Sequence, residues 1–221
     1  MTPPIPTPIY RLMHVVSFET CLKRARMHSP NHTPNDRLPW RHIHDTAVQL
    51  GRRAQPVTCE PPPGRVKGVV HDYVPFYFGV FSPMLLRLKT GRVEGYDEGQ
   101  EPLVYVRSTA QRIADSGTDY VFSDAHGLAS FTHWYDDLKY LDKVDWGVVG
   151  LRYWQDTVDD PDRQRRKQAE FMVHRGCDLG LVEEIGVHGD SMKRRVEGLL
   201  QSHRPELAIP VSDRRHDWYY P

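Results

Sequence analysis

The sequence predicts an α+β fold, with a mixed central sheet and short helices in a single domain that spans residues 1–221. Three observations support this prediction. Apolar runs typical of strands recur along the whole chain, while amphipathic helical stretches are brief and follow no regular βαβ order. The 18 prolines favour many loops and short elements. The length of 221 residues suits one domain rather than two.

The first elements are predicted by the spacing of apolar residues. Residues 9–16 (IYRLMHVV) have the pattern of a strand that is buried on both faces. Ser17 can cap the helix that follows. One face of that helix is apolar at i, i+3, i+4 and i+7, namely Phe18, Cys21, Leu22 and Ala25. The Pro-, Asn- and His-rich residues 27–39 predict a loop.

Later elements follow in the same way. A second helix is expected to end near Gly51, with Arg52 and Arg53 just past it, and residues 56–64 (PVTCEPPPG) predict a rigid connector. Extended segments are expected at 71–84, 103–106, 120–122, 170–173 and 181–187. Further helices are expected from Ser108 or Thr109 to Gly117, from Leu128 to Leu138, and after a cap at Asp190. Residues 156–168 are polar throughout and predict a long exposed loop.

The composition excludes several classes of protein. Lys plus Arg and Asp plus Glu number 29 each, so neither a uniformly basic nucleic-acid arm nor an acidic tail is indicated. No apolar run approaches the ~20 residues of a membrane-spanning helix. Residues 1–6 lack the charged and apolar regions of a signal peptide. The three widely spaced cysteines form no CxxC metal site and suit a reducing compartment, so we expect a cytoplasmic protein.

Common catalytic motifs are absent from the sequence, including GxxxxGK[ST], GxGxxG, GxSxG and HExxH. His42 and His44 form an HxH pair in a segment with a helical pattern. Residues i and i+2 of a helix point apart, so surface histidines are favoured over a metal site. A metal nuclease of the PD…(D/E)xK type would need an acid-x-Lys triplet after Pro161-Asp162, whereas the nearest such triplet, residues 137–139, precedes it.

Residues 163–171 (RQRRKQAEF) are the most informative stretch. Four cations precede Glu170, which opens a predicted strand. For a charge run alone, the favoured interpretation is a solvated loop beside a surface glutamate. The alternative is a cationic substrate loop that leads to a catalytic carboxylate, kept ionised by nearby arginines. Residues 72–78 (DYVPFYF) pose a similar choice between core packing and a stacking surface for a nicotinamide or a base.

Several segments stand in an order that is specific when taken together. They are residues 9–14 (IYRLMH), 52–57 (RRAQPV), 72–78 (DYVPFYF), 82–84 (SPM), 120–126 (YVFSDAH), 144–146 (VDW), 165–171 (RRKQAEF) and 218–220 (WYY). Over nearly the whole chain they resemble the DarT family, the DNA ADP-ribosyltransferase toxins of DarT–DarG toxin–antitoxin systems. One departure is Gly79-Val80-Phe81, where the family pattern has a Pro-Arg pair. The form of the motifs is more similar to the thymidine-modifying branch of the family.

The resemblance implies a PARP-like ADP-ribosyltransferase fold. It implies an enzyme that splits NAD, used as co-substrate without a metal, and transfers ADP-ribose to a base in single-stranded DNA. Glu170 matches the catalytic glutamate. Arg53, or its neighbour Arg52, matches an arginine near the reacting groups, and we expect Arg53 to face the site. The implied NAD-binding residues are His14, Arg52, Tyr73, Phe76 and Met84. The implied DNA-binding residues are His126, Arg163, Arg165, Arg166 and Lys167.

The resemblance also implies partners, namely single-stranded DNA and a DarG-like macrodomain antitoxin, with no membrane. Taken without the resemblance, His14 favours a buried structural histidine. Two other functions stay open: a binding module without catalysis that grips single strands, and ADP-ribosylation of protein, which the same fold supports. Glu170 would weaken the grip of a pure binding module. Incubation with labelled NAD and either oligonucleotides or total protein separates the three possibilities.

Overall fold

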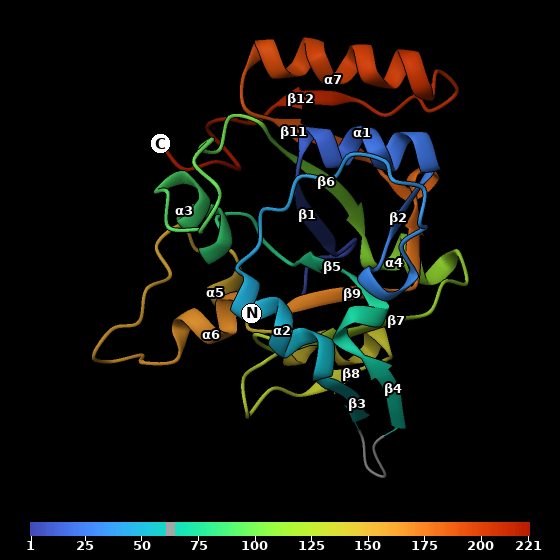
Figure 1. Cartoon of the computed structure of the whole chain (residues 1–221). Coiled ribbons are helices and arrows are strands. Elements are labelled where there is room, and N and C mark those ends of the chain that lie inside the picture. The colour runs from blue at the N-terminus through green and yellow to red at the C-terminus, as the bar shows by residue number, and fades with distance from the viewer. Residues whose placement is uncertain (61–64) are drawn as a thin grey trace.

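The computed structural model of the chain describes residues 1–60 and 65–221. Its strands are β1 (Pro8–His14), β2 (Arg26–His28), β3 (Pro56–Glu60), β4 (Arg65–Val69), β5 (Tyr73–Tyr77), β6 (Leu103–Thr109), β7 (Tyr120–Ser123), β8 (Trp134–Tyr135), β9 (Glu170–His174), β10 (Gly176–Asp178), β11 (Glu184–Val187) and β12 (Val211–Asp213). Its α-helices are α1 (Val15–Arg24), α2 (Thr46–Ala54), α3 (Pro83–Lys89), α4 (Ala110–Asp115), α5 (Trp146–Val149), α6 (Arg163–Lys167) and α7 (Asp190–His203). Figure 1 shows their arrangement.

Within the described residues, ten strands form one sheet in the order β12-β11-β6-β1-β5-β9-β7-β8-β3-β4. Neighbours run antiparallel except for the parallel pairs β11–β12 and β3–β8. The short strands β2 and β10 form a separate pair. In Figure 1, α1 and α7 lie together at one end of the molecule, and α2 lies with β3 and β4 at the other. The predicted α+β fold with a mixed central sheet is confirmed.

The sheet is nearly divided between β1 and β5. Strand β1 pairs with β6 from Pro8 to His14, but its pairing with β5 is confined to Tyr10 and Tyr77. Beyond that pair the two strands diverge. The Arg11 side chain bridges them, because its Nη1 donates to the Pro75 carbonyl oxygen at 2.9 Å. The division leaves backbone and side chains of both strands free to line a cavity.

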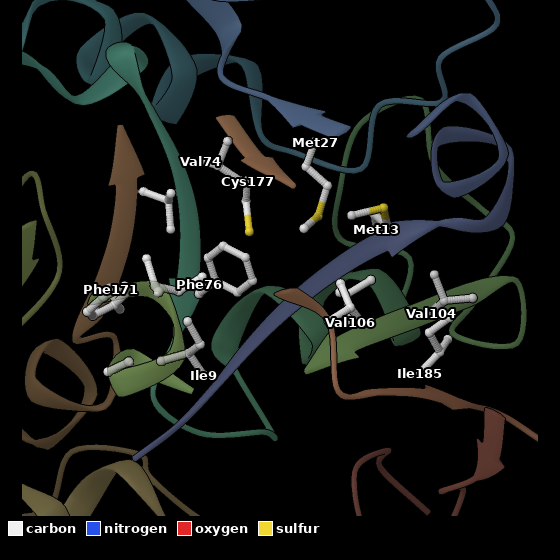
Figure 2. Packing of buried hydrophobic residues seen from close by; sticks show 14 of the residues in the cluster. Ile9, Met13, Met27, Val74, Phe76, Val104, Val106, Phe171, Cys177 and Ile185 are labelled. Atoms are coloured by element: carbon white, nitrogen blue, oxygen red, sulfur yellow. The ribbon is translucent and has the colours of Figure 1, made fainter. Parts of the chain in front are cut away.

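The main core lies along the strands near this division. Figure 2 shows Ile9 and Met13 of β1 packing among side chains from other strands, including Phe76 of β5 and Phe171 of β9. Phe76 and Phe171 are partners in the β5–β9 register, so their rings are brought to the same place on the sheet. This packing fixes β9 against β5, and it therefore fixes Glu170, the first residue of β9.

Several predicted boundaries shift by a few residues. Helix α1 is capped by His14, whose ring accepts from the Val16 N–H, rather than by Ser17. Helix α2 runs on to Ala54, so Arg52 and Arg53 belong to it. The predicted connector 56–64 is in part strand β3, and its residues 61–64 lie outside the described residues. The predicted cap Thr109 and the stop at Gly117, which has a positive φ, are confirmed.

Two predictions of element type are wrong. The helix expected from Leu128 to Leu138 is a loop followed by strand β8, because Trp134 and Tyr135 pair with β7 and β3. The exposed loop expected at 156–168 ends in helix α6, which is held by contacts described below. In the part of the chain that is described, no helix is long and apolar enough to cross a membrane.

Candidate active site

A cavity of about 740 Å³ lies where β1 and β5 diverge. Residues 10–14 of β1 and alternate residues of β5 form its floor, and much of segment 28–45 forms one wall. The remaining lining residues include Gln49, Arg52, His71, Met84, Arg87, His126, Gln164, Gln168 and Glu170. Helix α2 and the start of β9 are far apart in the sequence, so the cavity exists only in the folded chain.

An ion pair between Arg52 and Glu170 forms the most deeply buried polar contact of the cavity. Nη1 of Arg52 donates to the two carboxylate oxygens of Glu170 at 2.8 and 3.0 Å. The residues are only 6% and 2% exposed. Burial acts to lower the pKa of Arg52, but the adjacent carboxylate raises it further, so the guanidinium stays charged. The two oxygens of the Glu170 carboxylate have lone pairs left to accept hydrogen bonds from a ligand.

Arg53 does not face the cavity, and the expectation that it would is wrong. Successive residues of an α-helix point about 100° apart. The side chain of Arg52 therefore enters the cavity, whereas Arg53 is exposed on the outer side of α2. The dipeptide alone could not decide between them, because the choice depends on which face of α2 packs on the sheet.

His14 ends β1 at the other side of the cavity and is 5% exposed. Its Nδ1 accepts from the Val16 backbone N–H at 3.1 Å. The neutral ring therefore carries its proton on Nε2, which lies 3.1 Å from a carboxylate oxygen of Glu98. Burial lowers the pKa of His14, and Glu98 opposes that effect.

The other residues implied for NAD are divided between the cavity and the core. Tyr73 and Met84 line the cavity, whereas Phe76 does not. Phe76 is 1% exposed and packs in the core, so its expected contact with NAD is wrong. Side chains of a strand point alternately to its two faces. Tyr73, Pro75 and Tyr77 therefore lie on the cavity face of β5, and Phe76 lies on the opposite face. The same alternation, applied to residues 73–77, would have identified Tyr77 as a cavity residue from sequence.

His126 lines the cavity close to Glu170. Its backbone N–H donates to the Arg165 carbonyl oxygen at 3.0 Å, which ties its loop to α6. At the next residue, Gly127, a Cβ atom would lie 3.3 Å from Oε2 of Glu170. Burial lowers the pKa of His126, so its ring is a neutral donor and acceptor near pH 7.

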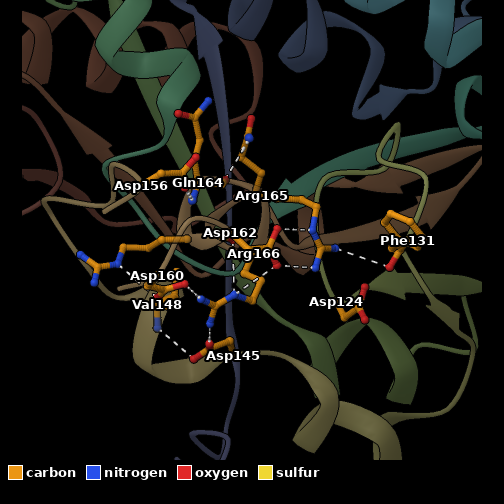
Figure 3. A network of polar contacts seen from close by, with 12 residues as sticks. Asp124, Phe131, Asp145, Val148, Asp156, Asp160, Asp162, Gln164, Arg165 and Arg166 are labelled. Carbon is orange, nitrogen blue, oxygen red and sulfur yellow. Dashed lines mark hydrogen bonds and ion pairs between the residues drawn. The ribbon is translucent and has the colours of Figure 1, made fainter. Parts of the chain in front are cut away.

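The arginines of α6 are paired with acids, as Figure 3 shows. Arg165 makes a two-pronged contact with Asp162, at 2.6 and 2.7 Å. Arg166 bonds to Asp145 and Asp160, and Arg163 pairs with Asp160 at 3.4 Å. The exposed cationic loop predicted from the sequence is therefore wrong: these guanidinium groups are neutralised, and Gln164 and Gln168 line the cavity in their place.

Lys167 is also misassigned by the sequence, because its side chain is buried and bonded to backbone. Its Nζ donates to the carbonyl oxygens of Val80 and Val149 at 2.8 and 2.5 Å. Gly79 permits this close approach, since a Cβ there would overlap the Val149 carbonyl oxygen. Burial lowers the pKa of Lys167 to about 7. Lys167 thus anchors the end of α6, three residues before Glu170, and is not available to DNA.

The HxH pair lies in the segment before α2 rather than on a helix. His44 Nε2 is 2.9 Å from His42 Nδ1, and both residues line the cavity wall. Among the described residues, no group of three or more His, Cys, Asp or Glu side chains could hold a metal ion. Sequence reasoning also missed the wall formed by segment 28–45, because residues 27–39 were assigned only to a loop, and His42 and His44 were assigned to the surface of a helical segment.

Comparison with known proteins places these features in one family. A family model described as ssDNA thymidine ADP-ribosyltransferase, DarT, matches residues 10–220. A protein of Thermus sp. (strain 2.9) named DNA ADP-ribosyl transferase is 35% identical over 219 residues, covering 99% of each chain. One of the same name from Escherichia coli O127:H6 is 30% identical and covers 77% of this chain and 75% of its own.

Solved structures agree. Thermus sp. 2.9 DarT in complex with ADP-ribosylated ssDNA superposes with a TM-score of 0.89 at 34% identity, covering 100% of this chain and 99% of that one. The same Thermus DarT in complex with NAD+ gives a TM-score of 0.82 at 34% identity, covering 99% of this chain and 100% of that one.

Proposed function

The chain belongs to the DarT family of ssDNA thymidine ADP-ribosyltransferases, and from this premise we propose that it transfers ADP-ribose from NAD+ to thymidine in single-stranded DNA, with Glu170 as the catalytic carboxylate. The buried Arg52–Glu170 pair at the cavity carries the assignment of Glu170. A pure binding module has no need for a buried carboxylate at the centre of its cavity, where the negative charge would repel phosphates.

Glu170 acts on the ribose that carries nicotinamide. Its carboxylate accepts the hydrogen of a ribose hydroxyl and stabilises the positive charge that develops on the ribose as the nicotinamide–ribose bond breaks. Nicotinamide leaves as a neutral molecule, and a ring atom of thymine forms the new bond to the ribose carbon. The proton that thymine loses passes to Glu170 or to water.

Arg52 holds this carboxylate in place. Both hydrogen bonds from its Nη1 hold Glu170 in one orientation, so the acceptor oxygens do not reorganise during the reaction. The rest of the guanidinium remains near the reacting groups, where it can stabilise a deprotonated thymine ring. His126 is proposed as the residue beside the acceptor base, because its loop contacts both α6 and Glu170.

His14 is proposed to hold the second ribose of NAD+, that of adenosine. It lines the same cavity as Glu170 but lies on the other half of the divided sheet, and no hydrogen bond joins it to Arg52 or Glu170 in the described residues. Tyr73 and Met84 supply apolar surface for the nicotinamide end or the adenine end of the molecule.

The decisive experiment uses NAD+ labelled in its ADP-ribose part with four substrates: thymidine-containing single strands, matched strands without thymidine, their duplexes, and total cell protein. We expect label on the first only, because a paired base is stacked and its edge is occupied, and extruding it costs a few kcal/mol. Glu170→Gln serves as the inactive control. Label on total protein and none on DNA, or label on duplex as strongly as on single strands, would overturn the proposal.

The biological setting follows from family membership and is proposed with it. As a single domain spanning residues 1–221, the enzyme would act in the cytoplasm as a toxin, where genomic DNA and NAD+ are both present. A macrodomain antitoxin similar to DarG is the partner expected to reverse or mask its action. Co-expression of such a macrodomain should restore growth to cells that the wild-type enzyme arrests, and should have no effect on cells expressing Glu170→Gln.

A further inference from the structure

The turn formed by residues 91–99 brings an acidic side chain, that of Glu98, to His14. The turn precedes β6 and contains Gly91, Gly95 and Gly99, all with positive φ. Tyr96 braces it, because its hydroxyl donates to the Gly99 carbonyl oxygen at 2.9 Å. The turn leads into Leu103, which is the partner of His14 in the β1–β6 register. Glu98 thereby contacts His14, a residue of the cavity lining, although Glu98 itself does not line the cavity and nothing in its local sequence indicates a site.

The carboxylate of Glu98 joins His14 to the cavity wall. One oxygen lies 3.1 Å from His14 Nε2, and the other accepts from Arg41 Nε at 2.6 Å. Arg41 also donates to the Gly95 carbonyl oxygen, at 2.9 Å, and its guanidinium lies over the Tyr96 ring. Arg41 belongs to segment 28–45, which forms one wall of the cavity.

These contacts use up the hydrogen-bonding capacity of the His14 ring. Nδ1 is occupied by the Val16 N–H, and the Nε2 proton is directed at Glu98. A ribose hydroxyl can bind at His14 only if it enters between the ring and the carboxylate. It then accepts from the Nε2–H and donates to Glu98, so every polar group keeps a partner. The Glu98 side chain is 38% exposed, so it has room to withdraw by the width of a hydroxyl.

We propose that Glu98 determines the preference for NAD+ over NADP+ by accepting the adenosine ribose 2′-hydroxyl held at His14. The inference rests on the proposed function, since it takes His14 as the residue that binds this ribose. A 2′-phosphate in its dianionic form has no hydrogen to donate to the carboxylate. Its negative charge would also lie beside the negative charge of Glu98. Glu98 also neutralises Arg41, which would otherwise attract the phosphate.

The test compares kcat/KM for NAD+ and NADP+ in wild type and in Glu98→Gln, with single-stranded thymidine oligonucleotide as acceptor. Glutamine keeps the size of the side chain and an oxygen that accepts from His14, but it removes the charge and replaces the oxygen that accepts from Arg41 Nε with an NH2 group that cannot accept. We expect the NAD+/NADP+ ratio to fall by about tenfold, mainly through a gain with NADP+, because Arg41 is released and the repulsion is lost.

Glu94→Gln is the matched control, because Glu94 is an exposed acid of the same turn and no hydrogen bond or ion pair of its side chain is found in the described residues. It should leave the ratio within about twofold of wild type. In Glu98→Gln, an unchanged ratio, or an equal loss with both dinucleotides, overturns this inference alone. A wild-type enzyme that transfers nothing from NAD+ overturns the proposed function, and this inference with it.

Discussion

Replacing Glu170 with alanine would remove one partner of a buried ion pair and leave the other charged. An exposed glutamate at the start of a strand would be dispensable for folding, but Glu170, which opens β9, has a buried side chain paired with Arg52. The side chains of Arg52 and Glu170 are 7% and 2% exposed, and Nη1 contacts both carboxylate oxygens. Little water reaches Arg52 to replace the lost carboxylate.

The cost of this substitution can be estimated from the burial. An uncompensated buried charge typically destabilises a protein by about 3–5 kcal/mol, which for a domain of this size lowers Tm by roughly 6–20 °C. Glu170→Gln retains a neutral acceptor for Arg52 and should cost only about 1–2 kcal/mol. Both variants should lose transfer by about 10²–10³-fold, because a preorganised transition-state group is gone.

Urea unfolding at pH 7 and label transfer from NAD+ would be measured for both single variants and for the double variant Arg52→Met, Glu170→Ala. The double variant should be more stable than Glu170→Ala alone, because no charge is left buried. Equal stability of Glu170→Ala and wild type would refute the reasoning about the pair. Glu170→Gln with more than about a tenth of the wild-type rate would refute the catalytic assignment.

Three further predictions follow from α6 and its anchors. Burial lowers the pKa of Lys167 to about 7, against ~10.4 in an unfolded chain. Between these two pH values the unfolded state therefore binds more protons than the folded state. The difference in unfolding free energy, wild type minus Lys167→Met, should rise with pH across this range. A difference that stays constant in urea titrations at several pH values would contradict this prediction. Arg165→Gln should leave the salt dependence of oligonucleotide binding unchanged, because Asp162 already neutralises the guanidinium; a slope flatter by about 0.7 would show that Arg165 contacts phosphate. Gly79→Ala should destabilise the fold by roughly 1–3 kcal/mol, because its Cβ would overlap a backbone oxygen; an unchanged Tm would show that the loop adjusts freely.

The strands that build the site were largely predictable. Strand β9 was expected at 170–173 and spans Glu170–His174, and β1 was expected within 9–16 and spans Pro8–His14. Both are short apolar runs, and an apolar run is a local property of the chain. The region 128–138 was mispredicted because its apolar spacing is only loosely helical, and the pairing of Trp134 and Tyr135 with neighbouring strands overrides it.

The electrostatic interpretation of α6 failed for a different reason. A run of four cations was visible in the sequence, and so were nearby aspartates, but which charges would pair was not. Asp145 lies 21 residues before Arg166, and the two meet only because α5 and α6 pack together. Counting charges along the chain therefore overestimated the positive field available to DNA.

The sequence by itself determined the fold class, the family, and the residue types of the site, with Glu170 at the start of a strand and His14 within another. These depend on local apolar pattern and on motif order. Only the tertiary structure decided that Arg52 rather than Arg53 enters the cavity, that Phe76 is core, and that Glu98 meets His14. Each of these depends on which face of an element is buried and on strand pairing between distant segments, which are set by packing free energy over the whole chain.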